Sequence, residues 1–446
     1  MQRRKSRIIT AAAIVLGIVV YFGFFVVEAA AAEAPAVSDT EQAVPNGPTS
    51  LDKLDLSGIE TTDADLARRL EGLTSLRELN LDRSKITDMG LVHLRGLSSL
   101  RNLFLCDTQI TDAGLEHLKG LTLLEHLYVS GTQITDAGLV HLKNLTALQY
   151  LFVHNTQVSD AGLAHIKGLT SLQSLSLHST QVTDAGLAYL QDMVSLETLY
   201  LHNTQVSDKG LAQLKDLTSL QYLCLLDTQV SDAGLAHLKG LTSLETLRLG
   251  YTQVSGKGLV HLKGLSSLRK LNLCATQVTD AGLEYLKNMV SLETLYLQNT
   301  QVSDEGLAHL KGLSSLRELS LRGTQISDEG LVHLKGLSSL RELSLRGTKV
   351  SNAGRAELKQ ALPGCSISGP DPLMAGRAKV RHNNAPKIGF VSIYALVLFG
   401  TFWLWMLVDC IRRPIAHKLR WILLVVLLNV LGAVLYFYIV NPDRRE

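Results

Sequence analysis

Three equally spaced histidines are the residues of this chain that come closest to a metal site. His154, His178 and His202 are 24 residues apart, and parallel stacking of the segments that carry them would place their side chains ~5 Å apart. Histidine imidazoles at such a separation could share a zinc ion, since imidazole is a common zinc ligand. A zinc site also needs a complete ligand set and a second shell, and no cysteine or carboxylate is clearly placed to supply them. We therefore expect no metal, and we interpret the three histidines as a ladder on a solvated face.

Recognisable catalytic combinations are missing from the sequence. It shows no general acid–base pair, no Gly-rich phosphate loop and no Ser-His-Asp arrangement at a usable spacing. We therefore expect no catalytic residues and no cofactor, and we predict that the protein is not an enzyme.

The histidines belong to a repeat of 24 residues. In a representative unit, residues 172–190, leucine first alternates with other residues and then follows a Leu-x-x-Leu spacing. This change of period predicts a short strand followed by a short helix in every repeat. The repeat is most visible in a column of threonine without drift, at Thr108, Thr132, Thr156, Thr180, Thr204, Thr228, Thr252, Thr276, Thr300, Thr324 and Thr348.

Other columns predict how each helix begins and ends. An aspartate recurs just before the helical leucines, from Asp88 to Asp328, where a helix N-cap is needed. Lysine followed by Gly or Asn, as in Lys119-Gly120, predicts a left-handed C-cap. A glycine column, from Gly90 onward, is best explained by close approach of the backbone at the turn into each helix.

The pattern Ile/Val-Thr/Ser-Asp-x-Gly-Leu after each strand resembles the leucine-rich repeats of F-box adaptors and of many bacterial surface proteins. The resemblance implies an α/β solenoid with a parallel sheet on its concave face and short helices on its convex face. Each unit is too small to bury its leucines alone, so stacked neighbours would supply the core. We expect about 13 strands in this solenoid, in addition to transmembrane helices outside it.

Binding residues must lie at the variable strand positions, because the leucines set the fold. Stacked in register, these positions give aromatic columns in the early and middle repeats and charged columns towards the C-terminal end. Stiff aromatic side chains are efficient binding anchors, although here they could instead only shield the sheet. We predict that the concave face binds an unidentified protein through Phe104, His126, Tyr128, Tyr150, Phe152, His154, His178, Tyr200, His202, Tyr222, Arg248, Arg322 and Arg346.

The distribution of charge argues against nucleic acid as a partner. Residues 51–365 contain 29 Lys and Arg against 33 Asp and Glu, so the repeat region has no excess of positive charge for a phosphate backbone. The positive excess lies at the two ends of the chain, beside hydrophobic runs, where a membrane topology signal belongs. Five cysteines, an odd number, do not indicate a disulfide framework.

Three hydrophobic runs predict attachment to a membrane. Residues 8–27 follow a basic start and indicate an export signal, either kept as an anchor or cleaved near the alanines that follow. Residues 388–410 and 421–440 are long enough to form a transmembrane hairpin. The cations in the connection of this hairpin favour the cytoplasmic side. We therefore predict the cytoplasmic (inner) membrane as the location, the bilayer as a second partner, and an extracytoplasmic solenoid.

The hairpin resembles the two-helix segment that precedes the catalytic domain in phospholipase D-like enzymes such as cardiolipin synthases. The matching residues are Trp403, Asp409, Trp421, Gly432 and Tyr436. In those enzymes the chemistry needs His-x-Lys and, after four further residues, an aspartate. His-x-Lys occurs seven times between residues 117 and 335, but leucine stands at the aspartate position each time. We interpret these occurrences as a by-product of the repeat.

The predicted order of the chain is a signal or anchor helix (1–32), a disordered linker (33–50), the solenoid (51–368), a linker (369–387), the hairpin (388–440) and a tail (441–446). It predicts a membrane-anchored bacterial protein for protein–protein recognition. One alternative is a non-catalytic regulatory subunit of a membrane enzyme, for example in phospholipid metabolism, engaged through the hairpin. A second is a substrate adaptor of the F-box type. The lack of an F-box-like helical segment before residue 51 argues against this second alternative.

Overall fold

The computed structural model describes residues 51–58 and 60–369. The predicted signal or anchor, the linker before residue 51, the hairpin and the tail lie outside the described residues, as does all but the first residue of the linker 369–387. Across the part that is described, every helix is too short or too polar to cross a bilayer.

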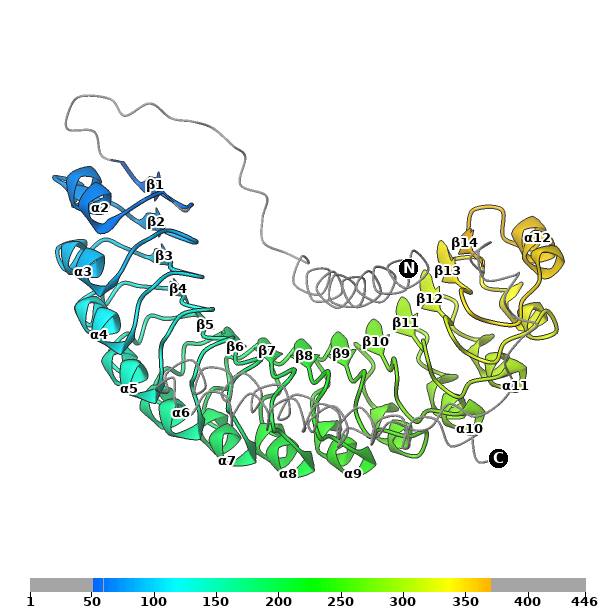
Figure 1. Ribbon diagram of the computed structural model, residues 1–446. Coiled ribbons are helices and arrows are strands. Elements are labelled where there is room, and N and C mark those ends of the chain that lie inside the picture. Colours follow the sequence, from blue (N-terminus) through cyan, green and yellow to red (C-terminus); the bar gives the residue numbers. More distant parts are fainter. Residues whose placement is uncertain (1–50, 59, 370–446) are drawn as a thin grey trace, which may run out of the picture. The chain divides into compact units, whose positions relative to one another are not determined.

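The described residues form a solenoid whose strands line its inner side and whose helices line its outer side (Figure 1). Neighbouring strands are parallel and follow the chain order without a crossover, which confirms the predicted sheet. The strands are β1 (Lys53–Asp55), β2 (Glu78–Asn80), β3 (Asn102–Phe104), β4 (His126–Tyr128), β5 (Tyr150–Phe152), β6 (Ser174–Ser176), β7 (Thr198–Tyr200), β8 (Tyr222–Cys224), β9 (Thr246–Arg248), β10 (Lys270–Asn272), β11 (Thr294–Tyr296), β12 (Glu318–Ser320), β13 (Glu342–Ser344) and β14 (Ser366–Ser368).

The described sheet has 14 strands, so the predicted number of about 13 was too low. The strand that the leucine pattern does not reveal is β14, which follows the turn at Pro363-Gly364 and has Ile367 in place of the usual leucine. It pairs with β13 in the same register as the strands before it.

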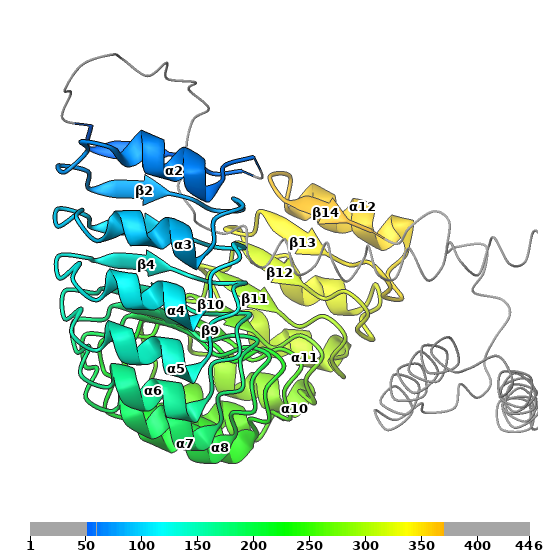
Figure 2. The ribbon, with the colours of Figure 1, turned by 60° about the vertical axis from the view of Figure 1, so that its left-hand side comes forward.

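The helices are short, as predicted, and lie side by side in one layer (Figure 2). Most repeats have one turn of α-helix that continues directly into a 3-10 turn. The α-helices are α2 (Asp63–Leu70), α3 (Asp88–Leu91), α4 (Asp112–Leu115), α5 (Asp136–Leu139), α6 (Asp160–Ile166), α7 (Asp184–Leu187), α8 (Asp208–Leu211), α9 (Asp232–Leu235), α10 (Asp280–Leu283), α11 (Asp304–Leu307) and α12 (Asn352–Ala361). The 3-10 helices are η1 (Val92–Leu94), η2 (Glu116–Leu118), η3 (Val140–Leu142), η4 (Ala188–Leu190), η5 (Ala212–Leu214), η6 (Ala236–Leu238), η7 (Gly258–Leu262), η8 (Glu284–Leu286), η9 (Ala308–Leu310) and η10 (Gly330–Leu334).

The core lies between the sheet and the helix layer and runs through the whole solenoid as one cluster. The central residue of each strand, leucine in β1 to β13 and Ile367 in β14, points into it, while the residues on either side point to the concave face. In residues 172–190 the fully buried side chains are Leu172, Leu175, Leu177, Val182, Leu187 and Leu190. Each repeat therefore depends on its neighbours to shield its leucines, as is usual in solenoids.

The aspartate column was wrongly interpreted as the N-cap. In α5 the N-cap is Thr135, whose hydroxyl accepts a hydrogen bond from the Ala137 N–H, and Asp136 is the first helical residue. The Asp136 carboxylate instead accepts hydrogen bonds from the Ser159 N–H and hydroxyl of the next repeat, both 2.6 Å long. The same pairing recurs along the helix layer, so the aspartates form a ladder that joins neighbouring repeats.

The glycine column is explained by the same ladder. A Cβ atom on Gly186 would clash with Oδ1 of Asp160 in the preceding repeat and would lie 3.0 Å from Leu163. Close approach was predicted, but the group that approaches is mainly the aspartate side chain. The glycine column and the aspartate column are therefore two halves of one contact between repeats.

In the described repeats, the Lys-Gly and Lys-Asn pairs do not form the predicted left-handed C-caps, and of the glycines at the helix ends only Gly72, after α2, has a positive φ (79°). Lys119, which follows η2, is right-handed, and Gly120 has no positive φ. Positive φ occurs instead at the residue before the threonine column, for example at Asn155 (φ 54°) and Ser179 (φ 54°). Asn, Asp and Gly often occupy this conformation. The threonine then closes the turn, since Thr156 Oγ1 donates a hydrogen bond to the Val153 carbonyl.

Within the described residues the aspartate ladder is interrupted at Gly256, which stands where the neighbouring repeats have Asp232 and Asp280. Thr279 of the next repeat lacks this carboxylate partner, and its hydroxyl makes no cap hydrogen bond. A Cβ on Gly282 would clash with Gly256 Cα, so the two backbones lie close together. This repeat also has the 3-10 helix η7 without an α-helical turn.

Candidate functional site

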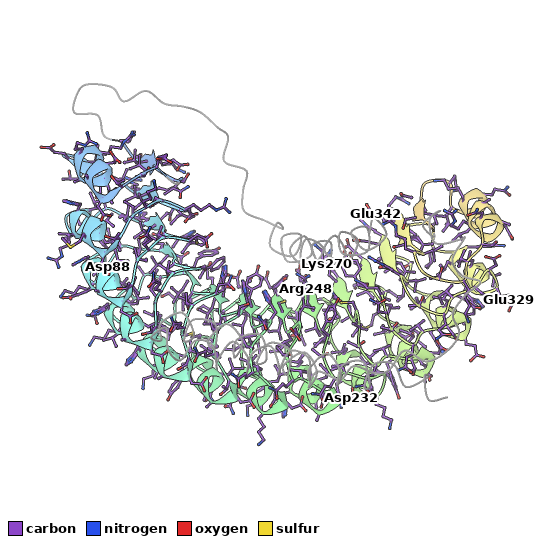
Figure 3. All side chains as sticks on the ribbon, viewed as in Figure 1. Asp88, Asp232, Arg248, Lys270, Glu329 and Glu342 are labelled. Atoms are coloured by element: carbon purple, nitrogen blue, oxygen red, sulfur yellow. The ribbon has the colours of Figure 1, made fainter. Side chains whose placement is uncertain are left out.

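The predicted binding residues lie in three rows on the concave face. The first row consists of the first residue of each strand, the second row of the third residue, and the third row of the residue two positions beyond the strand end. His126 and Tyr128 of β4 stand directly beside Tyr150 and Phe152 of β5, which confirms the predicted columns. Figure 3 shows Arg248, Lys270 and Glu342 on the strand side of the solenoid and Asp88, Asp232 and Glu329 on the helix side.

Aromatic side chains of the second row contact one another from β3 to β5. The rings of Phe104 and Tyr128 are stacked, with their centroids 4.7 Å apart and an angle of 8° between their planes. Tyr128 then meets Phe152 edge to face at 4.8 Å. Burial among these rings raises the pKa of Tyr128 to about 12, so its hydroxyl is neutral at pH 7.

The aromatic contacts continue past a small residue in β6. Ser176 is 2% exposed, and Phe152 and Tyr200 meet at a centroid distance of 6.3 Å although their strands are separated by β6. Tyr200 in turn contacts Tyr222 of the first row at 4.9 Å. We name the connected set Phe104, Tyr128, Phe152, Tyr200 and Tyr222 the aromatic row.

His126 and Tyr150 form a second contact beside this row. Both belong to the first row, and their ring centroids are 4.3 Å apart at an angle of 32°. Burial lowers the pKa of His126, which favours the neutral imidazole. The predicted residues of the first and second rows thus form a largely uncharged surface over β3 to β8.

The three histidines of the third row are stacked as a ladder. Ring centroids are 3.9 Å apart for His154 and His178 and again for His178 and His202. The His154 Nδ1 lies 2.8 Å from Ser130 Oγ and 3.1 Å from Ser176 Oγ. This geometry is closer than the ~5 Å expected from the strand spacing, because the rings tilt into face-to-face contact.

Burial keeps this histidine ladder neutral. It lowers the pKa of His154 and of His202 to about 4 and that of His178 to about 2, where the two flanking rings add to the effect. Nearly parallel rings cannot direct their lone pairs at one ion. Among the described residues, no group of three or more His, Cys, Asp or Glu is arranged to hold a metal.

Charged side chains begin where the aromatic row ends. Arg248 of β9 donates a hydrogen bond to the Tyr222 hydroxyl (3.3 Å), and burial raises the pKa of this tyrosine to about 12. Further along, the Tyr296 hydroxyl donates a hydrogen bond of 2.8 Å to Glu318. Arg322 and Arg346 are exposed in the third row. The face therefore changes from aromatic to charged between β8 and β13.

Two family models match parts of the chain. The model described as Leucine rich repeat matches residues 74–134 and 266–326. The solenoid is built from leucine-rich repeats. The model described as Phospholipase D-nuclease N-terminal matches residues 401–439, which agrees with the resemblance seen in the hairpin. A match to this N-terminal segment does not by itself indicate catalysis.

Solved structures contain similar solenoids. An internalin (inlF) of Listeria monocytogenes is 29% identical, with a TM-score of 0.54 over 66% of this chain and 86% of that chain. A leucine-rich repeat protein of Leptospira interrogans is 19% identical, with a TM-score of 0.51 over 71% of this chain and 90% of that chain, and shares the fold. No curated protein matches the sequence.

The columns in the sequence did not reveal which side chains of the leucine-rich repeat face contact one another. The columns placed Phe152 and Tyr200 two strands apart, and their contact depends on the small side chain of Ser176 between them. The hydrogen bond between Tyr296 and Glu318 was also not predicted. A search for large residues on either side of a serine within one column would have found the first contact.

Proposed function

We propose that this chain is a membrane-anchored leucine-rich repeat protein that recognises a partner protein through its concave face on the extracytoplasmic side of the cytoplasmic membrane. The observation that carries the proposal is the aromatic row, in which Phe104, Tyr128, Phe152, Tyr200 and Tyr222 form a connected surface on the solvent side of the sheet. The leucine-rich repeat fold itself suggests protein recognition.

The aromatic row has no role in filling the core. The core between sheet and helices is already closed by the leucines, with Leu127 and Leu151 fully buried. Tyr128 and Phe152 lie on the other side of the sheet and keep part of their surface exposed. Stacked rings with two restricted torsions lose little entropy on binding, and such residues dominate the energy of many protein interfaces.

A photoreactive phenylalanine analogue tests this role directly. Placed at Tyr128 or Tyr200 and irradiated in intact cells, it is expected to give an adduct with one discrete protein. The same analogue at Val194, which is 55% exposed and lies in the connection after η4, is the matched control. Adducts of equal yield and size from the concave positions and from Val194, or no adduct from the concave positions, would contradict the proposal.

Membrane attachment is supported by the hydrophobic runs at both ends of the sequence and by the match to the Phospholipase D-nuclease N-terminal model at residues 401–439. Protease added to intact spheroplasts is expected to digest the solenoid. Protection of the solenoid until the spheroplasts are lysed would place it in the cytoplasm and overturn the proposed topology.

The match at residues 401–439 also favours a second candidate function. In this alternative, the chain is a non-catalytic regulatory subunit that binds a membrane enzyme through its hairpin. Pull-down with the hairpin alone, without the solenoid, separates the two functions. Recovery of the same membrane enzyme as with the full chain favours the regulatory subunit, whereas recovery that requires the solenoid favours recognition by the concave face.

A further inference from the structure

The last repeats of the concave face have opposite charges in two separate rows. Residues 312–324 and 336–348 have the same sequence, so β12 and β13 present the same side chains. Glu318 stands beside Glu342 in the first row. The ladder continues beyond the strands, where the Gly323 N–H donates to the Arg346 carbonyl at 2.8 Å, and this places Arg322 beside Arg346 in the third row. We name these four residues the charged end.

Like charges that stand directly opposite each other on adjacent strands destabilise a sheet. The hydrogen bond from the Tyr296 hydroxyl stabilises the negative charge of Glu318 and so offsets part of this repulsion. Glu342 is exposed, and no ion pair formed among residues 51–58 and 60–369 involves either of the two carboxylates. A cation supplied from outside would relieve the remaining repulsion between them.

The surface between these strands is hollowed. A shallow hollow of about 210 Å³ is lined by the two glutamates, by Tyr296 and Gln298, by the buried leucines of β12 and β13, and by four serines: Ser320, Ser344, Ser366 and Ser368. The small serine side chains leave room for a side chain of a partner, whereas rings like those of the aromatic row would fill the same space. Within the described part of the chain, Gln298 Oε1 accepts no hydrogen bond. The hollow is therefore rich in hydrogen-bond acceptors, as a guanidinium or ammonium group requires.

We propose that the charged end binds a polypeptide segment of the partner that presents a lysine or arginine to Glu318 and Glu342 and an aspartate or glutamate to Arg322 and Arg346. This inference rests on the proposed function and names the chemistry of the partner at one end of the same face. The two rows are four residues apart in each repeat, and an extended partner chain of that length spans ~13 Å. An extended partner segment matches this separation when its cation and its anion are also four residues apart.

Charge complementarity would act mainly on specificity. A partner with the opposite order of charges would place like charges against both rows, which disfavours its binding. The aromatic row can bind many apolar surfaces, whereas the charged end favours partners whose charges complement its two rows. The two parts of the face therefore have different tasks, anchoring over β3 to β8 and selection over β12 to β14.

The test uses the full chain in detergent and three capped peptides measured by calorimetric titration. The first peptide is acetyl-Gly-Arg-Ser-Gly-Ser-Glu-Gly-amide, and the other two replace its Arg or its Glu by Gln. We expect the first peptide to bind at least tenfold more tightly than either of the others. Glu342→Gln should remove the advantage conferred by Arg in the peptide, and Arg346→Gln should remove the advantage conferred by Glu.

Glu329→Gln is the matched control, because Glu329 is exposed and lies on the helix side (Figure 3). It should change none of the three affinities. Equal affinity for all three peptides, or equal loss for all three upon Glu342→Gln, overturns the inference.

Failure of the inference is distinguishable from failure of the proposed function. The protein recovered by photocrosslinking provides the second measurement. If its binding is lost upon Tyr200→Ser but unchanged by Glu342→Gln and by Arg346→Gln, the inference is overturned and the proposed function stands. If Tyr200→Ser leaves its binding unchanged, the proposed function fails.

Discussion

The ring of Phe152 meets the ring of Tyr200 across Ser176, with 6.3 Å between their centroids. The two residues belong to β5 and β7, and the serine of β6 is small enough for the rings to close over it. This contact joins two aromatic groups into one surface from β3 to β8. The proposed recognition by the concave face relies on this continuous aromatic surface.

The glycine column provides a test of how the repeats fit together. Gly186→Ala should lower the free energy of unfolding by ~1–3 kcal/mol, because the added methyl group clashes with Asp160 and crowds Leu163. Gly168→Ala is the control, since a Cβ there meets nothing within 4 Å and φ is not positive. It should be neutral or stabilising by up to ~1 kcal/mol. Urea unfolding of both variants provides the comparison, and equal losses would contradict this account of the column.

The aspartate ladder should contribute more to stability than surface aspartates do. Asp184 accepts hydrogen bonds from the Ser207 N–H and hydroxyl, both 2.6 Å long. Asp184→Ala is expected to lower the free energy of unfolding by about 2 kcal/mol, the range for hydrogen bonds to charged groups. Asp192→Ala, at an exposed position, should change it by less than ~0.5 kcal/mol. A loss at Asp184 no larger than at Asp192 would show that the ladder does not stabilise the stack.

The histidine ladder predicts that stability falls in acid. Burial lowers the pKa of His154 and of His202 to about 4, so between pH 6.5 and 4 the unfolded chain binds more protons than the folded chain. The stabilisation is complete above pH 6.5 and is lost as the pH falls towards 4, at about 1.4 kcal/mol per pH unit for each histidine.

Melting temperatures measured between pH 7 and pH 4.5 check this dependence. Replacement of His154, His178 and His202 by Asn should flatten the profile, whereas His93→Asn, at an exposed position, should leave it steep. Parallel profiles for the wild type and the triple variant would refute the role of burial.

Gly256 should mark the repeat that opens first. The aspartate ladder is interrupted there, and the neighbouring helix η7 has no α-helical turn. Few hydrogen bonds between repeats mean a low cost of local opening. Amide hydrogen exchange is expected to be faster in residues 256–286 than in residues 160–190, which contain an intact ladder. Equal exchange rates in the two segments would show that the stack of repeats is not weaker at Gly256.

The constant period made much of the fold predictable. Alternation around Leu127 and Leu151 placed their neighbours on the concave face, and the register between β4 and β5 confirms it. The role of Asp136 was not predictable from spacing, because Thr135 and Asp136 are adjacent and both residue types cap helices. The contact with Ser159 of the next repeat decides between them. Ring contacts were equally inaccessible, because a column fixes where a residue stands and not how its side chain turns.

Binding of the crosslinked partner to two tyrosine variants tests the central claim most directly. Tyr200 lies in the aromatic row, whereas Tyr189 is 38% exposed on η4 of the helix layer. If the concave face is the recognition surface, Tyr200→Ser should raise the dissociation constant about 30-fold, as expected for a hot-spot residue worth ~2 kcal/mol, and Tyr189→Ser should leave it unchanged. Equal dissociation constants for the wild type and Tyr200→Ser, or a larger effect at Tyr189, would contradict recognition by the aromatic row.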